Sequence, residues 1–331
     1  MIEIVSKLHE TVPPFISRAL SSPAMQRLKD VGMNCGCEYT SFPCFTVLPP
    51  YSRYEHSLGV SLIVWHFSHD EKQALSALFH DIATPVFAHV IDFMRGDYLT
   101  QEATEDGTKE FIERDPVITA LLSELGLSVG DVSDYHLYPV ADNKSPRLCA
   151  DRLEYTLENM VHYRHASVEE ALEMYSDLTV EKNEEGVPEL VFRTEEPARR
   201  FSHNALSCGM FYTTDQDRYS MQRLSEICLD AVRRNVITEA DLYTDETGVI
   251  QKFSTDPETW AKWTDFRKMC QIRAAKEPEG PGPWRKINAK KRYIDPYVLN
   301  KGRVSLLDPS FAEKKRLFEA LSFDYYVIGG H

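Results

Sequence analysis

Residues 77–89 read ALFHDIATPVFAH. The apolar residues that lead into this stretch, from Ala74 to Phe79, recur with the spacing of a buried helix face. The helix then ends on two adjacent polar side chains, His80 and Asp81, and another histidine, His89, follows five residues after Thr84. An ionised carboxylate at the end of a packed helix must be paired or bound to a metal, because burying it alone is costly. The stretch therefore predicts a helical fold with a polar site at the end of a core helix.

Two more polar residues stand where a packed helix would carry apolar ones. His56 opens an apolar helix predicted over 55–69, and Asp151 lies in the apolar run LCADRL, residues 148–153. A single buried histidine is more often a hydrogen-bonded core residue than a ligand, so the prediction rests on the whole set. Together these side chains predict a divalent metal ion as cofactor, with the ligands His56, His80, Asp81 and Asp151. Mixed nitrogen and oxygen ligation suits Mn, Fe, Co, Ni, Zn or Mg.

Composition limits the class of protein. The chain has 331 residues, 43% hydrophobic and 27% charged, which is ordinary for a soluble globular protein. The net charge of −14 argues against stable nucleic-acid binding, but a metal ion and a few arginines can still attract a small phosphate ester. No apolar run is long enough to span a membrane and the N-terminal segment is charged, so we expect a cytoplasmic protein with no membrane partner. The seven cysteines are expected to be reduced thiols.

Helical periodicity dominates the first half of the chain. Helices are predicted over 16–31, 55–69, 71–83, 101–114, 116–125, 148–164, 197–235 and 309–323, and a β-hairpin over 177–192. The fold class is therefore mainly α, with a small α+β C-terminal part that contains the hairpin. We expect residues 1–170 to form a helical core with the metal site, and residues 171–331 to pack on it, unless the two form one continuous domain.

Three motifs carry a family resemblance: RYEHSLGV (53–60), ALFHD (77–81) and ADRLEY (150–155). Together they resemble the HD-domain metal-dependent phosphohydrolases, and most of all the deoxynucleoside triphosphate triphosphohydrolases. The similarity covers roughly residues 20–165, with a weaker match at KKRYIDPYV (290–298). It implies an HD-domain helical core and the metal ligands named above. It also implies that Arg53, Arg152, Tyr155 and Asn159 bind the phosphates and sugar of a substrate.

The chain departs from this family at two positions. Where the family has H-D-x-G-H-x-P-F-S-H, Thr84 replaces the middle histidine, and Gln101-Glu102 replaces a later His-Glu pair. His89 and Asp92 match the pattern and are spaced to hydrogen-bond, so His89 is the expected catalytic acid, oriented by Asp92. Glu102 is a second catalytic candidate, with a helix N-terminal role as its alternative. Thr84 and Gln101 are assigned to substrate binding, with a Thr-Pro turn or a cap as the alternative for Thr84.

The function expected from these features is hydrolysis of a phosphate ester or anhydride of a nucleotide by a metal-bound water. Two alternatives stay open. One is a catalytically impaired, nucleotide-binding regulatory HD module, which the replaced histidines favour. The other is a phosphatase acting on a non-nucleotide phosphoester. The resemblance also predicts a homo-oligomer. A basic run between Arg285 and Arg303 is either a solvated surface, a contact for polyphosphate or an effector, or a basic surface for a partner.

Overall fold

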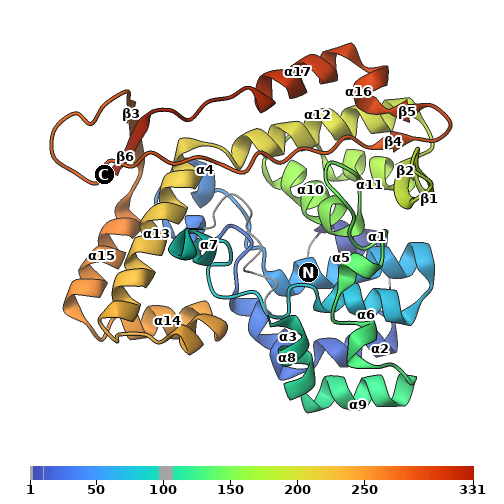
Figure 1. The fold of residues 1–331 in the computed structure, drawn as a ribbon, viewed down its shortest axis with the longest axis horizontal. Coiled ribbons are helices and arrows are strands. Elements are labelled where there is room, and N and C mark those ends of the chain that lie inside the picture. The colour runs from blue at the N-terminus through green and yellow to red at the C-terminus, as the bar shows by residue number, and fades with distance from the viewer. Residues whose placement is uncertain (1–2, 10, 97–106) are drawn as a thin grey trace.

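The computed structural model describes residues 3–9, 11–96 and 107–331. The fold is mainly helical, as predicted (Figure 1). In its N-terminal half the longer helices are α2 (Pro14–Leu20), α5 (Arg53–Ser68), α6 (Glu71–Phe79), α9 (Pro116–Leu125) and α10 (Ala150–His162). In the C-terminal half they are α11 (Val168–Ser176), α12 (Glu195–Phe211), α13 (Asp215–Arg233), α14 (Glu246–Phe253), α15 (Pro257–Lys268) and α17 (Pro309–Glu319). Short helices complete the set: α1 (Glu3–Leu8), α3 (Pro23–Gln26), α4 (Pro43–Thr46), α7 (Val90–Arg95), α8 (Thr108–Arg114) and α16 (Val304–Leu307).

An antiparallel helix pair forms the centre of the N-terminal half. Helix α5 begins at a capping box in which Ser52 accepts from the Glu55 N–H and Glu55 accepts from the Ser52 N–H. It ends at His69, which has a left-handed backbone, and Asp70 then caps α6. A connection this short makes α5 and α6 pack side by side, and α10 packs on α5 as well. The first turn of α5 therefore lies beside the last turn of α6.

The strands form two small sheets. The predicted hairpin is present as β1 (Leu178–Lys182) and β2 (Pro188–Phe192), and its turn is closed by Asn183 Oδ1, which accepts from the Glu185 and Val187 N–H groups. Strand β4 (Tyr297–Val298) pairs parallel to β2 and antiparallel to β5 (Gly302–Arg303). A second sheet pairs β3 (Gln271–Ala275) antiparallel with β6 (Tyr326–Gly330).

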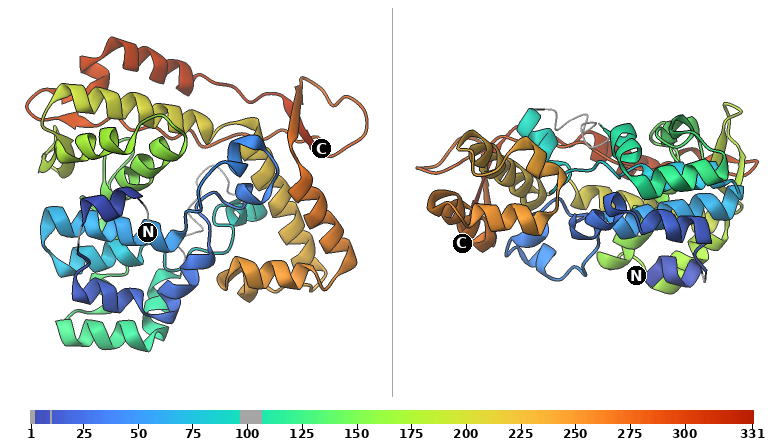
Figure 2. Two further views of the ribbon diagram at one scale, coloured as in Figure 1. Left: turned by 180° about the vertical axis from the view of Figure 1, so that it is seen from behind. Right: turned by 90° about the horizontal axis from the view of Figure 1, so that it is seen from below.

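The helices form two groups on opposite sides of the molecule. Helices α13, α14 and α15 group on one side of the molecule, and α5, α6, α9 and α10 on the other (Figures 1 and 2). One hydrophobic cluster joins α5 and α10 to α11, α12 and α17, so it includes residues from both sides of position 170. A second cluster joins α7 to α13, α14 and α15. The division at residue 170 stays a prediction.

A long extended segment links the two groups. Between β3 and β4 the chain runs alongside α12 (Figure 1). It lies against the helix at Gly209, where a Cβ atom would stand 2.2 Å from the Arg292 carbonyl oxygen. We call residues 285–296 the strap. Its close contact with α12 requires a glycine at that point.

Several predicted boundaries were wrong. The helix expected over 16–31 breaks at Ser21 and Ser22, because Pro23 begins a new helix, α3, with Ser22 as its cap. The helix expected over 197–235 is interrupted by a turn at Tyr212–Thr214, and Thr214 caps α13. Of the helix expected over 101–114, residues 101–106 lie outside the described residues and α8 covers Thr108–Arg114. Helices α14 and α15 and the β3–β6 sheet were not predicted.

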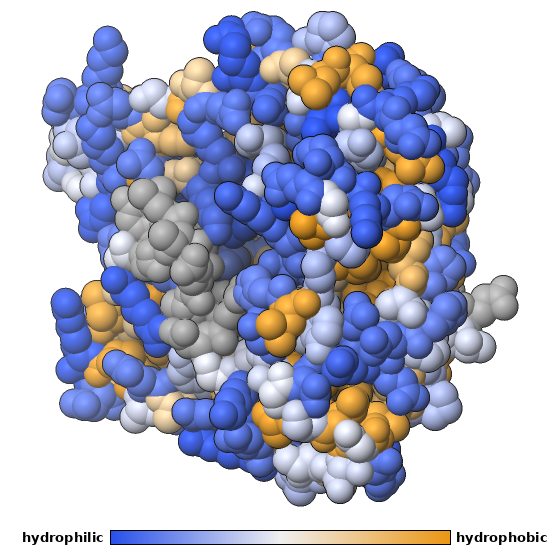
Figure 3. Space-filling model, turned by 45° about the vertical axis from the view of Figure 1, so that its right-hand side comes forward, coloured by the Kyte–Doolittle hydropathy of each residue, from blue (hydrophilic) through white to orange (hydrophobic). Residues whose placement is uncertain are grey.

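The surface is largely polar. On the face shown in Figure 3, hydrophobic side chains form separate patches among hydrophilic ones, as is usual for a solvent-exposed surface. Among the described helices, none is both long enough and apolar enough to cross a lipid bilayer.

Candidate metal centre and substrate cavity

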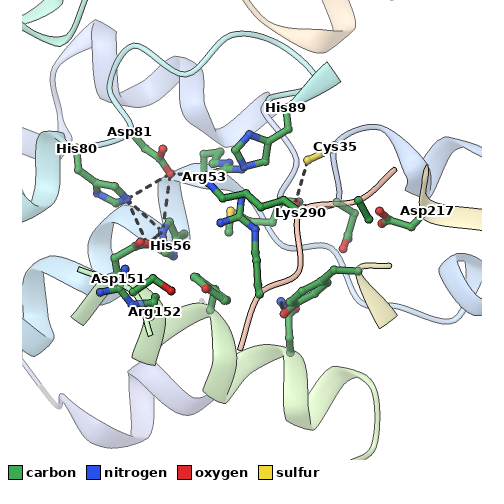
Figure 4. A pocket seen from close by; sticks show the side chains of 18 of the residues that line it. Cys35, Arg53, His56, His80, Asp81, His89, Asp151, Arg152, Asp217 and Lys290 are labelled. Carbon is green, nitrogen blue, oxygen red and sulfur yellow. Dashed lines mark hydrogen bonds and ion pairs between the residues drawn. The ribbon is translucent and has the colours of Figure 1, made fainter. Parts of the chain in front are cut away.

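Three helix ends bring the predicted ligands together. His56 lies in the first turn of α5, His80 caps the end of α6, and Asp151 lies in the first turn of α10. The Nε2 atoms of His56 and His80 are 3.2 Å apart, and Asp151 Oδ1 is 3.1 Å from His56 Nε2. Asp81 Oδ2 lies 3.5 Å from His80 Nε2 and 3.8 Å from His56 Nε2 (Figure 4). The structure thus groups all four residues predicted as ligands.

The hydrogen bonds made by Nδ1 of His56 and of His80 determine whether Nε2 of each ring can bind a metal ion. His80 Nδ1 donates to the Ala77 carbonyl, 2.7 Å away, and His56 Nδ1 donates to the Glu154 carboxylate. With Nδ1 used as a donor, each imidazole in its neutral form has its lone pair on Nε2. Two lone pairs and a carboxylate oxygen then face one another. A shared divalent cation fits this donor set, since each group is a normal ligand for one.

The charges around His56 and Asp81 also favour a cation at this site. Burial alone disfavours the imidazolium form of His56, but Glu154 and Asp151 outweigh burial and raise the pKa of His56 to about 10. Burial likewise disfavours the charged form of Asp81, yet Arg53 and the two histidines hold the pKa of its carboxyl well below the usual range. The centre therefore favours a positive charge between His56 and its acidic neighbours, as a proton or a metal ion would supply.

Glu154 orients His56 and was not predicted as a site residue. It is buried on α10, one turn after Asp151, and it also accepts from the Tyr51 hydroxyl. Gly59 of α5 faces it: a Cβ there would lie 2.6 Å from Glu154 Cγ. The glycine of the RYEHSLG motif therefore makes room for the carboxylate that holds His56. The sequence signal that could have identified Glu154 is a charged residue three positions after Asp151, on a buried helix face.

Asp81 is held from two sides. Arg53 Nη1 donates to Asp81 Oδ2 at 2.8 Å, and Thr84 Oγ1 donates to Asp81 Oδ1 at 2.8 Å. Thr84 is fully buried and lies behind Asp81 instead of on the cavity wall. The structure therefore differs from the prediction that Thr84 contacts the substrate, because the Thr84 hydroxyl already donates to the Asp81 carboxylate. Arg53 does line the cavity, beside the metal centre.

His89 and Asp92 form the predicted pair. His89 Nδ1 donates to Asp92 Oδ2 at 2.9 Å, and His89 lines the cavity while Asp92 is buried behind it. Two consecutive left-handed residues, Phe87 (φ 58°) and Ala88 (φ 46°), turn the chain just before His89. Burial lowers the pKa of His89 to about 4 against the opposing effect of Asp92. The ring is therefore neutral at pH 7, which differs from the expectation of an imidazole that titrates near neutrality.

One face of α10 carries three of the residues that were predicted to bind the substrate. Arg152, Tyr155 and Asn159 all line the cavity. Arg152 already donates to Asp142 Oδ1 at 2.9 Å and to the Arg147 carbonyl at 2.8 Å, so it holds the loop before α10. Asn159 Nδ2 donates to the Tyr212 hydroxyl at 2.8 Å. Gln101 and Glu102 lie outside the described residues.

The four predicted ligands, Arg53, His89 and the three residues of α10 line one cavity of about 900 Å³. Residues from the loop Met33–Cys35, from α13 and from the strap complete its wall. Four residues of the strap line the cavity: Asn288, Ala289, Lys290 and Arg292. Lys291 does not, and its Nζ donates to the Leu321 carbonyl. Other members of the basic run pair with acids away from the cavity, such as Arg285 with Glu226 and Lys301 with Glu195. The basic run is thus divided between the cavity and the outer surface.

Comparisons with known proteins agree with this architecture. The chain is 26% identical over 328 residues to a metal-dependent phosphohydrolase, cns2, of Cordyceps militaris, covering 92% of this chain and 88% of the relative. It is 24% identical over 265 residues to the uncharacterized protein YdhJ of Bacillus subtilis, covering 78% and 77%. No family model matches the chain.

Solved structures share the fold. A phosphohydrolase from Bacteroides thetaiotaomicron superposes with a TM-score of 0.62 at 12% identity, covering 96% of each chain. A hypothetical protein from Aquifex aeolicus also gives a TM-score of 0.62, at 15% identity, covering 96% of this chain and 92% of its own. At these identities the likeness concerns the fold alone.

Proposed function

We propose that this chain is a metal-dependent phosphohydrolase of the HD-domain type, and that it hydrolyses a phosphate ester or anhydride of a nucleotide. The observation that carries the proposal is the convergence of His56 Nε2, His80 Nε2 and Asp151 Oδ1, whose outer hydrogen bonds leave lone pairs facing inward. Similarity to a metal-dependent phosphohydrolase over 92% of the chain supports the same reaction class.

A divalent cation bound by His56, His80, Asp81 and Asp151 would supply Lewis acidity and a water of lowered pKa. Arg53, held at 2.8 Å from Asp81, directs its positive charge at the phosphoryl group and stabilises the charge that develops there. Lys290 and Arg292 add positive charge from the strap on the same cavity. The net charge of −14 makes such local cations necessary for holding an anionic substrate.

His89 is the group we assign to proton transfer. Its Nδ1 hydrogen is used on Asp92, so the neutral ring offers Nε2 as an acceptor on the cavity side. A phosphate dianion beside it stabilises the imidazolium form, so the ring takes up a proton with the substrate and delivers it to the leaving oxygen. Glu102 keeps its predicted role as a second candidate.

The size and the lining of the cavity support a nucleotide as the substrate. A volume of about 900 Å³ is far more than a phosphate group needs, and Tyr155, Tyr163 and Tyr212 line it. Aromatic side chains suit the stacking of a planar base. The burial of Thr84, in place of the family histidine, favours the second candidate, a regulatory module that binds nucleotides without turnover.

One experiment distinguishes a phosphohydrolase from a module that binds nucleotides without turnover. Release of phosphate and polyphosphate is measured from ribo- and deoxynucleoside mono-, di- and triphosphates, with the protein loaded in turn with Mn, Co, Ni, Mg and Zn. We expect turnover that is lost in Asp81→Ala and unaffected in Asp230→Asn, a surface carboxylate far along α13. Absence of turnover with every metal, together with a nucleotide-dependent rise in melting temperature, would establish the binding module instead.

A further inference from the structure

The end of the cavity opposite the metal centre carries an isolated acid. Asp217, in the first turn of α13, lines the cavity there, and Figure 4 shows it across the cavity from His56, His80 and Asp151. The strap residue Lys290 and the loop residue Cys35 lie between the two ends. A substrate whose phosphate sits at the metal centre therefore reaches Asp217 only with its distal part.

Among the residues that the structure describes, none forms an ion pair with Asp217, whereas Asp81 pairs with Arg53 and Asp142 with Arg152 on the same wall. Among the described residues, the Asp217 carboxylate contacts the Cys37 thiol at 4.0 Å, which is a weak hydrogen bond. The neighbouring Arg218 points elsewhere and donates to Asp215 and to carbonyls of Thr213 and Ile287. Burial raises the pKa of Asp217 to about 8, against the opposing charges of Arg218 and Arg292. Hydrogen-bond donors of a ligand would stabilise the Asp217 carboxylate, because few donors of the protein do so.

The surroundings of Asp217 are aromatic. Tyr163 lines the cavity and stacks on Phe211 with ring centroids 4.1 Å apart. Tyr212 and Tyr155, 6.5 Å apart, continue this wall toward the metal centre. Rigid rings with one acceptor at their end match a flat heterocycle that carries N–H groups on its edge.

We propose that Asp217 is the specificity-determining residue for the base of the substrate, accepting hydrogen bonds from a base edge with adjacent N–H donors, as in guanine. Two N–H donors side by side stabilise the ionised form of this acid, and its two acceptor oxygens then match them. Guanine offers its ring N1–H and its 2-amino group in that arrangement, whereas hypoxanthine lacks the amino group. This inference rests on the proposed function, because it takes the phosphate end to lie at the metal centre.

A purely structural role makes a different prediction. An acid in the first turn of a helix stabilises it through the helix dipole, and the Asp217 N–H is capped by Thr214 Oγ1 at 3.4 Å. If that were the whole role, Asp217→Asn would lower the melting temperature slightly and leave the preference among ligands unchanged.

The test uses nucleosides, which lack the phosphate and so do not depend on metal or hydrolysis. Guanosine and inosine are titrated calorimetrically into the full chain, into Asp217→Asn, and into Asp230→Asn, which removes a carboxylate of the same helix away from the cavity. We expect guanosine to bind at least about tenfold more tightly than inosine, because inosine leaves one carboxylate oxygen unpaired. We expect Asp217→Asn to abolish that ratio and Asp230→Asn to preserve it.

Several outcomes overturn the inference. Equal affinities in the wild type, or a ratio that survives in Asp217→Asn, exclude Asp217 as the specificity residue. Failure of the wild type to bind either nucleoside does the same, even when phosphate release that depends on Asp81 shows that the proposed function holds. As a second measurement, the KM for guanosine monophosphate relative to inosine monophosphate should rise in Asp217→Asn, with little change in kcat.

Discussion

At the scale of single residues, the metal centre depends on side chains that hold the ligands. Glu154 fixes the tautomer of His56, and Thr84 and Arg53 fix both oxygens of Asp81. That His56, His80, Asp81 and Asp151 lie together could be predicted, because histidines and aspartates in apolar helices need a partner. Glu154 was not predicted, because its role depends on the distance between two helices.

The first prediction concerns Glu154→Gln. An amide binds His56 Nδ1 less strongly and lacks the negative charge, so His56 becomes a weaker and less well oriented ligand. Metal affinity should fall by roughly 10- to 100-fold, as measured by titration with Mn²⁺. Glu158→Gln, one turn further along α10, is the matched control and should bind metal normally. Equal affinities in Glu154→Gln and wild type would show that Glu154 does not position His56.

The second prediction concerns Thr84→Val, which keeps the shape and removes the hydroxyl. Asp81 then loses one donor in a buried setting, at a cost of about 1–3 kcal/mol in unfolding free energy. The activity should fall through kcat, with KM nearly constant, because Thr84 lies behind Asp81. Thr84→Ser should restore both quantities. A change confined to KM would instead indicate that Thr84 contacts the substrate.

At the scale of elements, helix ends and one strap build the cavity. The short turn between α5 and α6 places His56 beside His80, and α10 packs on α5 so that Asp151 joins them. The strap then covers one side, and its residues Lys290 and Arg292 line the cavity. Its position depends on Gly209, because only a glycine lets the Arg292 carbonyl approach α12.

The third prediction is that Gly209→Ala displaces the strap. The added Cβ would stand 2.2 Å from the Arg292 carbonyl oxygen, and a backbone atom must move to relieve the clash. Overpacking should reduce the unfolding free energy by about 1–3 kcal/mol, partly offset by the better helix propensity of alanine. The KM for a phosphate ester should rise, because Lys290 and Arg292 move with the strap.

Gly130→Ala is the control for that change. Its Cβ would meet only Ser128 Oγ, at an ordinary distance of 3.7 Å, so stability should change by less than about 0.5 kcal/mol. If Gly209→Ala also left stability and KM unchanged, the strap would be free to adjust and would not position the cations.

At the scale of the whole molecule, buried acids tie distant loops together. Glu246 of α14 accepts from the N–H groups of Gly32 (2.9 Å) and Phe87 (3.2 Å) and from the Tyr39 hydroxyl (2.7 Å). It thereby connects α14 to the cavity loop at residues 33–35 and to the turn before His89. Glu38 lies nearby, and its buried Oε2 has no hydrogen-bond partner among the described residues.

The fourth prediction is a pH dependence of stability. Burial, and then the charge of Glu246, raise the pKa of Glu38 to about 8. Between an unfolded pKa of about 4.3 and this folded value, the folded chain binds an extra proton, so its stability falls as pH rises through that range. Glu38→Gln removes this loss of stability. Above pH 8 the variant should therefore have a free energy of unfolding higher than that of the wild type, by a few kcal/mol at most.

Chemical denaturation at pH 5 and pH 8.5 measures the difference. The advantage of Glu38→Gln should be large at the higher pH and small at the lower one. Glu170→Gln, an exposed acid in the first turn of α11, should show no such dependence. An advantage that is the same at both values would mean that Glu38 does not titrate between them.

The sequence by itself determined the helical class, the hairpin and the identity of the four grouped polar residues. Local rules suffice for these features, since periodicity, turn residues and the cost of burying charge act over short stretches of chain. Only the tertiary structure decided that Thr84 serves Asp81, that Glu154 serves His56, and that His89 is kept neutral by burial. It also decided that Lys290, Arg292 and Asp217, from segments far apart in sequence, share a cavity with the metal centre. Those roles depend on which helix ends meet and which groups are shielded from water, and long-range packing sets both.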